Sequence, residues 1–225
     1  MLKNTAHAGV LKALLISNLV SVVLFALRVL VTQDTRYLFL FWNLLLAWIP
    51  LFWAWLLQKH LKTHAWREPL CVVLTLLWLA FLPNSFYLMS DLVHLQNTGE
   101  IGLLFDSVLF LSCIWNGAIA GFLSMYWLHK AVLRRRSPRR AAVAVGVVLL
   151  LTSFAIYLGR NLRWNSWDIL ANPAALLFDV SDRLVSPLAH PQVFLTTSTY
   201  FILLSSMYLV IWNLAGALQR EQPRL

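Results

Sequence analysis

The sequence predicts an all-α, polytopic membrane helix bundle with about six transmembrane helices. Hydrophobic residues make up 60% of the 225 positions, and charged residues make up only 12%. A soluble domain carries about 25% charged residues, so this composition excludes an ordinary soluble protein. The apolar residues also form long continuous runs, whereas the strands of an outer-membrane barrel alternate apolar and polar positions.

Each of the six predicted helices corresponds to one apolar segment. A transmembrane helix needs roughly 20 mostly apolar residues, and every segment approaches or exceeds that length. No long polar insertion separates the segments, so residues 1–225 are expected to form a single integral membrane domain. The segments comprise residues 10–32, 37–57, 69–88 (continuing to 95), 103–127, 141–158 and 193–214.

The distribution of lysine and arginine predicts that both termini are cytoplasmic. If the N-terminus is inside, 13 of the 18 basic residues fall on the cytoplasmic side, where membrane proteins concentrate them. The basic run Arg134–Arg140 then connects the fourth and fifth spans. It is expected to set the topology and to contact anionic lipid head groups. We do not expect it to bind nucleic acid, because no recognition fold accompanies it.

The end of the third span carries the first polar cluster. The stretch FLPNSFYLMSDLVHL, Phe81 to Leu95, begins as membrane-grade sequence and contains Pro83, which is expected to kink the helix. A helix from 69 to 95 would be about 40 Å long and would emerge on the outer side. Four polar side chains, at spacings of three, four and three, would share one helical face: Asn84, Tyr87, Asp91 and His94.

The end of the fifth span carries the second cluster, in the stretch GRNLRWNSWD. If this helix continues to Leu170, two arginines and two tryptophans share one face, and Asn161, Asn165 and Asp168 share an adjacent one. Arginine offers a planar fork of donors suited to carboxylate or phosphate. Tryptophan suits the membrane interface. Asp106, at the start of the fourth span, is expected at the same depth, and Arg36 lies in the first outer loop.

Two interpretations of these clusters remain open. In one, Asp91 forms a structural ion pair with Arg160 or Arg163, and the tryptophans only anchor the helices. In the other, the clusters line an outward-open pocket for an anionic or head-group-bearing ligand, since polar groups in membrane helices usually mark function. The candidate catalytic residues are Asp91 and His94. The candidate ligand-binding residues are Asn84, Tyr87, Arg160, Arg163, Trp164, Asn165, Trp167 and Asp168.

Asp91 and His94 also raise two chemical possibilities. His94 has an unperturbed pKa of about 6.5, and the nearby Asp91 would favour its charged form, as suits a proton relay or acid–base catalysis. A metal site would need Asp168 or His190 as a third ligand. Two-ligand fragments arise often by chance, so we predict no metal, and the sequence identifies no cofactor.

Two further features concern packing. Gly117 and Gly121 form a GxxxG motif, which lets helices approach closely, either inside the bundle or in a homodimer. We favour internal packing. Residues 174–186 carry apolar positions at helical spacing and are expected to form a short amphipathic helix on the outer interface. Such a helix would serve as a surface connector or as a lid over the pocket.

The two polar clusters also resemble the motifs of a known family. L-P-N-x-x-Y-L-x-x-D-L-x-H-L (Leu82–Leu95) and R-x-x-R-W-N-S-W-D (Arg160–Asp168) are similar to a bacterial membrane family catalogued as domain of unknown function 1361. The resemblance covers roughly spans two to six. Ser85 stands where that family usually has alanine or another small residue. The resemblance implies a multi-pass protein of a bacterial inner (plasma) membrane and implies no reaction.

Three functions are compatible with these observations. The first is an enzyme or binding protein for an anionic or lipid-linked ligand. The second is a small proton-coupled transporter, which would use broken helices and buried ionisable groups. The third is an accessory or assembly subunit of a membrane complex, in which the packing motifs would matter more than Asp91. The sequence does not decide whether the protein is an enzyme.

Overall fold

The computed structural model describes residues 2–96, 102–186 and 189–221, and every regular element in these ranges is helical. Six of the helices are long and apolar enough to cross a membrane, which confirms the predicted fold class. These six are α1 (Leu2–Thr32), α2 (Leu38–His60), α3 (Pro69–Tyr87), α4 (Leu103–Leu133), α5 (Pro138–Leu162) and α8 (Pro191–Glu221). The described residues also form three short elements, namely the 3₁₀ helix η1 (Ser90–His94), α6 (Asp168–Ala171) and α7 (Pro173–Val185).

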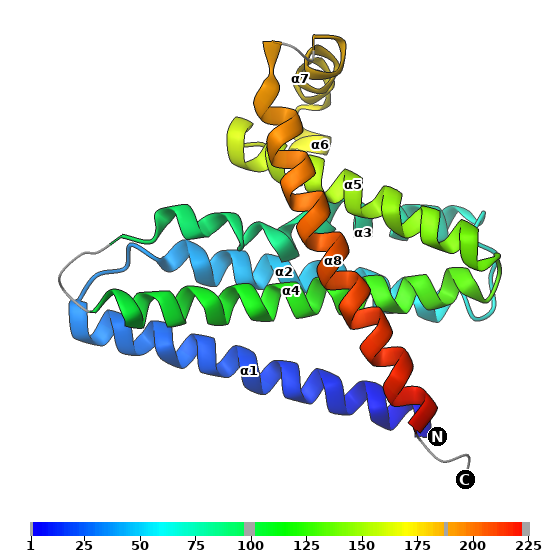
Figure 1. Cartoon of the computed structure of the whole chain (residues 1–225), viewed down its shortest axis with the longest axis horizontal. Helices are drawn as coiled ribbons and strands as arrows, with labels where there is room; N and C mark the ends of the chain where they lie inside the picture. The colour runs from blue at the N-terminus through cyan, green and yellow to red at the C-terminus, as the bar shows by residue number, and fades with distance from the viewer. Residues whose placement is uncertain (1, 97–101, 187–188, 222–225) are drawn as a thin grey trace.

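The bundle is built around α4, the most buried of the spans. Figure 1 shows α1, α2 and α4 running side by side, while α8 crosses them obliquely. α2 packs against both α3 and α4, and α8 packs mainly against α5. Because α8 packs mainly against one helix, it is the least buried span, and most of its apolar surface is available to lipid.

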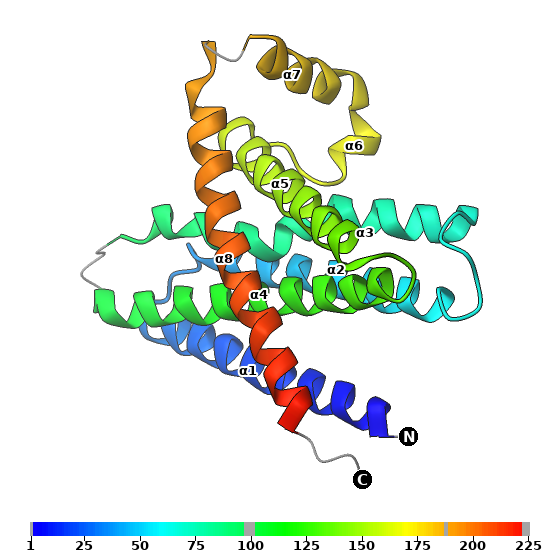
Figure 2. The same ribbon diagram turned by 45° about the vertical axis from the view of Figure 1, so that its right-hand side comes forward.

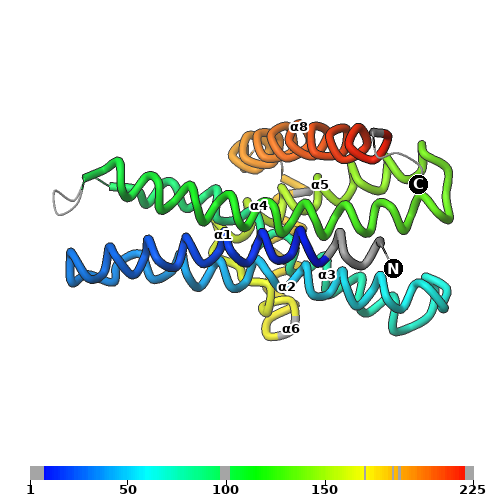
Figure 3. Tube along the Cα trace, turned by 90° about the horizontal axis from the view of Figure 1, so that it is seen from below, coloured from blue at the N-terminus to red at the C-terminus, as the bar shows by residue number. Residues whose placement is uncertain are grey.

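The connections divide between two sides of the molecule. The start of α1, the α2–α3 connection, the α4–α5 connection and the end of α8 lie on one side (Figures 1 and 3). We call this side the basic face, because residues 61–68 and 134–140 supply most of its arginines and lysines. An even number of spans places both ends of the helical chain on this face.

The two predicted extensions of the spans are only partly correct. The third span continues through Pro83 but ends as an α-helix at Tyr87, and residues 90–94 follow as η1 rather than as further α-helix. The fifth span ends at Leu162 and does not continue to Leu170. There Arg163 adopts a left-handed conformation with φ of 62°, which turns the chain away from the helix axis.

The two glycines of the GxxxG motif pack inside the bundle. A Cβ atom at Gly117 would lie 2.7 Å from the backbone oxygen of Ser85, and one at Gly121 would lie 2.7 Å from the Ser85 Cβ. Both glycines therefore face α3 of the same chain. The alternative, a homodimer through Gly117 and Gly121, would require α3 to be displaced.

We expect Gly117→Ala to destabilise the protein. The added methyl group would meet a backbone oxygen, which cannot move aside as a flexible side chain can. Overpacking of this kind costs about 1–3 kcal/mol. Gly146→Ala in α5 is the control, because a Cβ there meets no described atom within 4 Å. Thermal unfolding in detergent should show a lower midpoint for Gly117→Ala alone, and equal midpoints would contradict the close α3–α4 contact.

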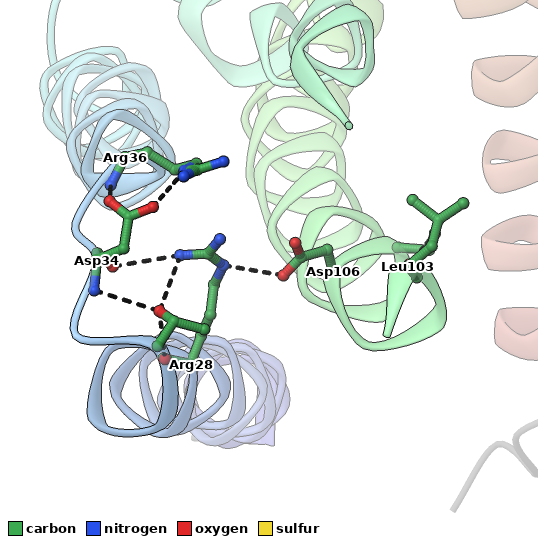
Figure 4. A network of polar contacts seen from close by, with 7 residues as sticks. Arg28, Asp34, Arg36, Leu103 and Asp106 are labelled. Atoms are coloured by element: carbon green, nitrogen blue, oxygen red, sulfur yellow. Dashed lines mark hydrogen bonds and ion pairs between the residues drawn. The ribbon is translucent and has the colours of Figure 1, made fainter. Parts of the chain in front are cut away.

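A buried ion pair joins α1 to α4. The Nε atom of Arg28 donates to Oδ1 of Asp106 at 2.9 Å, and the two side chains are 0% and 1% exposed. The same guanidinium donates to the backbone oxygen of Asp34 at 3.2 Å and lies 4.3 Å above the centre of the Tyr37 ring. Figure 4 shows Arg28 enclosed between the α1–α2 connection and the first turn of α4.

Two further outer polar groups, Asp106 and Arg36, are engaged away from the two polar clusters. Asp106 was expected at the depth of these clusters, and it pairs with Arg28. Arg36 bonds Asp34 through both its backbone N–H and its side chain. Neither residue lines the cavity described below.

Candidate functional site

The two predicted polar clusters meet in one cavity of about 690 Å³. It lies between α2, α3, η1, the end of α5 and the connection that leads to α6. Nine of the ten candidate residues line it, and Asp168 is the exception. Its polar lining comprises Asn43, Asn84, Tyr87, Asp91, His94, Arg160, Arg163, Asn165 and Ser166, and its aromatic walls are Phe39, Trp42, Trp164 and Trp167.

A network around Asp91 forms one wall of this cavity. The Asp91 side chain is 2% exposed and accepts a hydrogen bond from Asn43 Nδ2 at 2.8 Å. Arg160 NH1 lies 3.8 Å from the other carboxylate oxygen and 3.0 Å from Nε2 of His94. The predicted structural ion pair of Asp91 is therefore present with Arg160. The same groups line the cavity, so the two interpretations do not exclude each other.

The contact with Arg160 fixes the protonation of His94. A guanidinium offers only donors, so His94 Nε2 accepts, and a neutral ring then carries its proton on Nδ1. Burial, and secondarily the positive charge of Arg160, lower the pKa of His94 below its ordinary value. This is opposite to the sequence-based expectation that Asp91 would favour the charged imidazole. His94 is therefore an acceptor in the resting site.

The pKa of Asp91 shifts upward, in the opposite direction to that of His94. Burial raises its pKa from the ordinary 3.8 to about 6, although the Asn43 hydrogen bond and Arg160 both oppose that shift. Because the folded pKa exceeds the unfolded one, ionisation of Asp91 lowers the stability of the folded protein as the pH rises through about 4 to 6. A carboxyl group with a pKa near 6 gains or loses a proton close to physiological pH, which suits acid–base work.

Arg163 is an exposed residue of the cavity lining. No described residue makes a hydrogen bond or an ion pair with its guanidinium. Arg160, by contrast, is held by Asp91 and His94 and is 24% exposed. The cavity thus presents one positioned guanidinium and one that is available to a ligand.

The connection from α5 to α6 is stabilised by its own polar contacts. Asn84 Nδ2 donates to the Ser166 hydroxyl at 3.0 Å and so ties α3 to this connection. The backbone N–H of Asn165 donates to Asp168 Oδ2 at 2.7 Å. Asp168 closes this turn and is not among the residues that line the cavity.

The third ligands proposed for a metal site are also engaged elsewhere. His190 Nε2 lies 2.9 Å from Oδ2 of Asp182, and Asp168 bonds Asn165. In the described parts of the chain, no three His, Cys, Asp or Glu side chains gather closely enough to hold a metal ion. Among the described residues, neither Asp168 nor His190 joins Asp91 and His94 in such a group.

The amphipathic helix predicted at 174–186 is observed as α7, and it reaches the site. Leu176 lines the cavity, and Trp164 Nε1 donates to Oδ2 of Asp179 at 2.8 Å. Arg183 holds the same carboxylate through Oδ1 at 2.9 Å. Figure 2 shows α6 and α7 as an excursion between the end of α5 and the start of α8. α7 is thus attached to the cavity wall through Trp164.

Sequence reasoning missed Asn43 and Ser166. Asn43 was detectable, because it is the only amide or charged side chain in the apolar stretch 38–57. A lone polar residue in a membrane span needs a partner, and here that partner is Asp91. Ser166 lies within the second motif but was given no role.

The cavity combines guanidinium groups, an acceptor imidazole, a carboxyl group that titrates near pH 6, and tryptophans. No curated protein and no solved structure matches the chain. A family model does match it over residues 42–211, from the second turn of α2 to a point within α8, and this range contains both polar motifs and every residue that lines the cavity except Phe39. The chain therefore belongs to the family described as "Protein of unknown function (DUF1361)".

Proposed function

We propose that this multi-pass membrane protein binds an anionic head group or lipid-linked ligand in the cavity between α2, α3 and α5. The observation that carries the proposal is the convergence of Arg160 and Arg163 on one cavity of about 690 Å³. Arginine forks match phosphate and carboxylate geometry. The tryptophans give the same cavity apolar walls, which suits a ligand that is part polar and part lipid.

The proposed orientation places this cavity outside the cytoplasm. The basic face holds the α2–α3 and α4–α5 connections, and short cytoplasmic loops are enriched in lysine and arginine. η1 and the α5–α6 connection lie at the other ends of the spans. The membrane would be a bacterial inner (plasma) membrane, with both termini in the cytoplasm.

The site also supports a chemical role in this proposal. Arg160 and Arg163 would hold the anion, Asn84 and Tyr87 would donate hydrogen bonds, and Trp164 would wall the ligand. Asp91 in its protonated form is a general acid, and His94 is an acceptor that can take a proton at its free Nε2 once Arg160 turns to the ligand.

Proton-coupled transport is the second candidate. It is favoured by Asp91, a buried carboxyl group whose pKa is raised to about 6 and which faces Arg160. Protonation of Asp91 would release Arg160 to an anionic substrate, which couples the two events. A proton-dependent flux of anions into liposomes would support this candidate over a binding protein or an enzyme.

Native mass spectrometry of the mildly solubilised protein tests the proposal. Wild-type protein should retain an anionic molecule that Arg163→Gln weakens by about tenfold to a hundredfold, as expected for loss of one charged hydrogen bond. Arg36→Gln is the matched control, because it removes the same charge from an exposed site outside the cavity. Arg160→Gln should behave like Arg163→Gln.

Two results would count against this function. One is a wild-type protein that carries no anionic molecule and gains none when phosphatidylglycerol is added. The other is equal loss of the bound molecule from Arg163→Gln and Arg36→Gln. Either result would favour a role as an accessory subunit of a membrane complex. Co-purification of a membrane protein in a fixed stoichiometry would support that role.

A further inference from the structure

A second cavity, of about 670 Å³, lies on the basic face. It is formed where the α2–α3 connection meets the end of α4 and the first turns of α5. Four arginines line it together with small and aromatic apolar residues. The complete lining is Ala65, Trp66, Arg67, Val132, Arg135, Arg136, Arg140 and Ala144.

One of these arginines is fixed by the fold. A terminal nitrogen of Arg135 donates to the backbone oxygens of Leu61 and of His64, the latter at 3.1 Å. These oxygens belong to the end of α2 and the connection that follows, so Arg135 fastens α4 to that connection. Its charge is held at the cavity without a carboxylate partner among the described residues.

The other three arginines are free to meet a ligand. No described residue forms an ion pair with the side chains of Arg67, Arg136 or Arg140, and all three are exposed. The nearest acidic residue in sequence is Glu68. It faces His64 at 3.8 Å and accepts from the backbone N–H of Ala65 at 3.2 Å. The cavity therefore carries four positive charges with no neutralising group on its lining.

The apolar wall is also held in place. Trp66 Nε1 donates to the Thr75 hydroxyl at 3.0 Å, and Thr75 in turn donates to the backbone oxygen of Cys71 at 2.7 Å. The ring is thus fixed against the first turns of α3. Tryptophan beside arginines at the ends of membrane spans is typical of the depth at which lipid head groups lie.

We propose that this cavity binds the phosphate head group of an anionic membrane phospholipid. Basic pockets between transmembrane helices on the cytoplasmic side recognise such head groups. The arginines would contact the phosphate, and Trp66 and Val132 would contact the glycerol and the first methylene groups. Four guanidinium groups can serve two phosphates, so a cardiolipin should bind more tightly than phosphatidylglycerol. This site is separate from the cavity of the proposed function and does not depend on it.

The experiment compares two triple variants of equal charge. Arg67→Gln/Arg136→Gln/Arg140→Gln removes the free arginines of the cavity. Lys62→Gln/Arg134→Gln/Arg139→Gln removes three charges from the same face at exposed positions that do not line it. Delipidated protein is titrated in native mass spectrometry with cardiolipin, phosphatidylglycerol and phosphatidylcholine, and with inorganic phosphate as a soluble competitor.

The proposal expects a specific pattern. Wild-type protein should bind cardiolipin most tightly, then phosphatidylglycerol, and phosphatidylcholine least. The cavity variant should lose at least roughly tenfold in affinity for cardiolipin while the control variant keeps it. Equal losses in the two variants would indicate diffuse surface attraction and overturn the site. Displacement of the lipid by millimolar phosphate would overturn a membrane source for the ligand, and unchanged binding in both variants would overturn the site itself.

Discussion

Replacing Arg28 with methionine is expected to lower the free energy of unfolding by about 3–5 kcal/mol, because it leaves Asp106 buried without its partner. Both side chains are almost completely buried, so water cannot replace the lost contact. The change should be visible as a large fall in unfolding midpoint, in detergent or in a mixed-micelle denaturant titration. Asp106→Asn should also destabilise, though less, since an amide still offers an oxygen to Arg28.

Two controls make this prediction specific. The double variant Arg28→Met/Asp106→Leu should recover a large part of the loss, because a buried pair replaced by apolar residues leaves no orphaned charge. Arg36→Gln, in the exposed pair with Asp34, should cost less than about 1 kcal/mol. A double variant no more stable than Arg28→Met would mean that the guanidinium acts mainly through Asp34 and Tyr37.

The affinity of the α2–α3–α5 cavity for anions should rise as the pH falls through about 6. Above that pH, ionised Asp91 competes for Arg160, whose NH1 lies 3.8 Å from it. Burial raises the pKa of Asp91 to about 6, so at lower pH the carboxyl group is neutral and Arg160 is released. We expect an increase of about tenfold between roughly pH 7.5 and pH 5. Sulfate is a suitable probe, because it does not titrate in this range, and Trp42 or Trp164 can report its binding by fluorescence.

Asp91→Asn supplies the decisive comparison. Asparagine can still accept from Asn43, so the wall of the cavity is preserved, but the competing charge is gone. This variant should bind sulfate tightly at every pH and lose most of the pH dependence. His94→Gln separates the contribution of the imidazole, whose pKa is lowered by burial and by the charge of Arg160. A wild-type pH dependence that survives in Asp91→Asn and disappears in His94→Gln would reassign the switch to His94.

The spans were predictable because apolar length alone determines them. The six long helices follow the six apolar runs, and the amphipathic pattern at 174–186 became α7. The extensions beyond the membrane were less predictable. There, the direction in which side chains point depends on local turns, such as the 3₁₀ geometry at Ser90–His94 and the left-handed conformation of Arg163. Neither turn is marked by a residue type that would predict it from the sequence.

The sequence predicted most of the residues that line the cavity, but it did not predict which of them contact one another. Asp91 and Arg160 were found because ionisable groups at the ends of spans are rare and complementary in charge. Asn43 and the Arg28–Asp106 pair were missed, because sequence gives the depth of a residue in the membrane and not which neighbour its helix turns toward. For the same reason the depth of Asp106 was predictable, but not its partner Arg28, which the packing of α1 on α4 brings to it.

The Arg28–Asp106 pair also has a consequence for biogenesis. The two residues are 78 positions apart, so a ribosome working at about 5–20 residues per second makes Asp106 roughly 4–16 seconds after Arg28. During that interval α1 carries a charge that the finished protein buries and neutralises. α1 must therefore remain in contact with water or with the insertion machinery until α4 emerges. The Arg28–Asp106 pair, which fixes α1 against α4, can therefore form only after the fourth span has been synthesised.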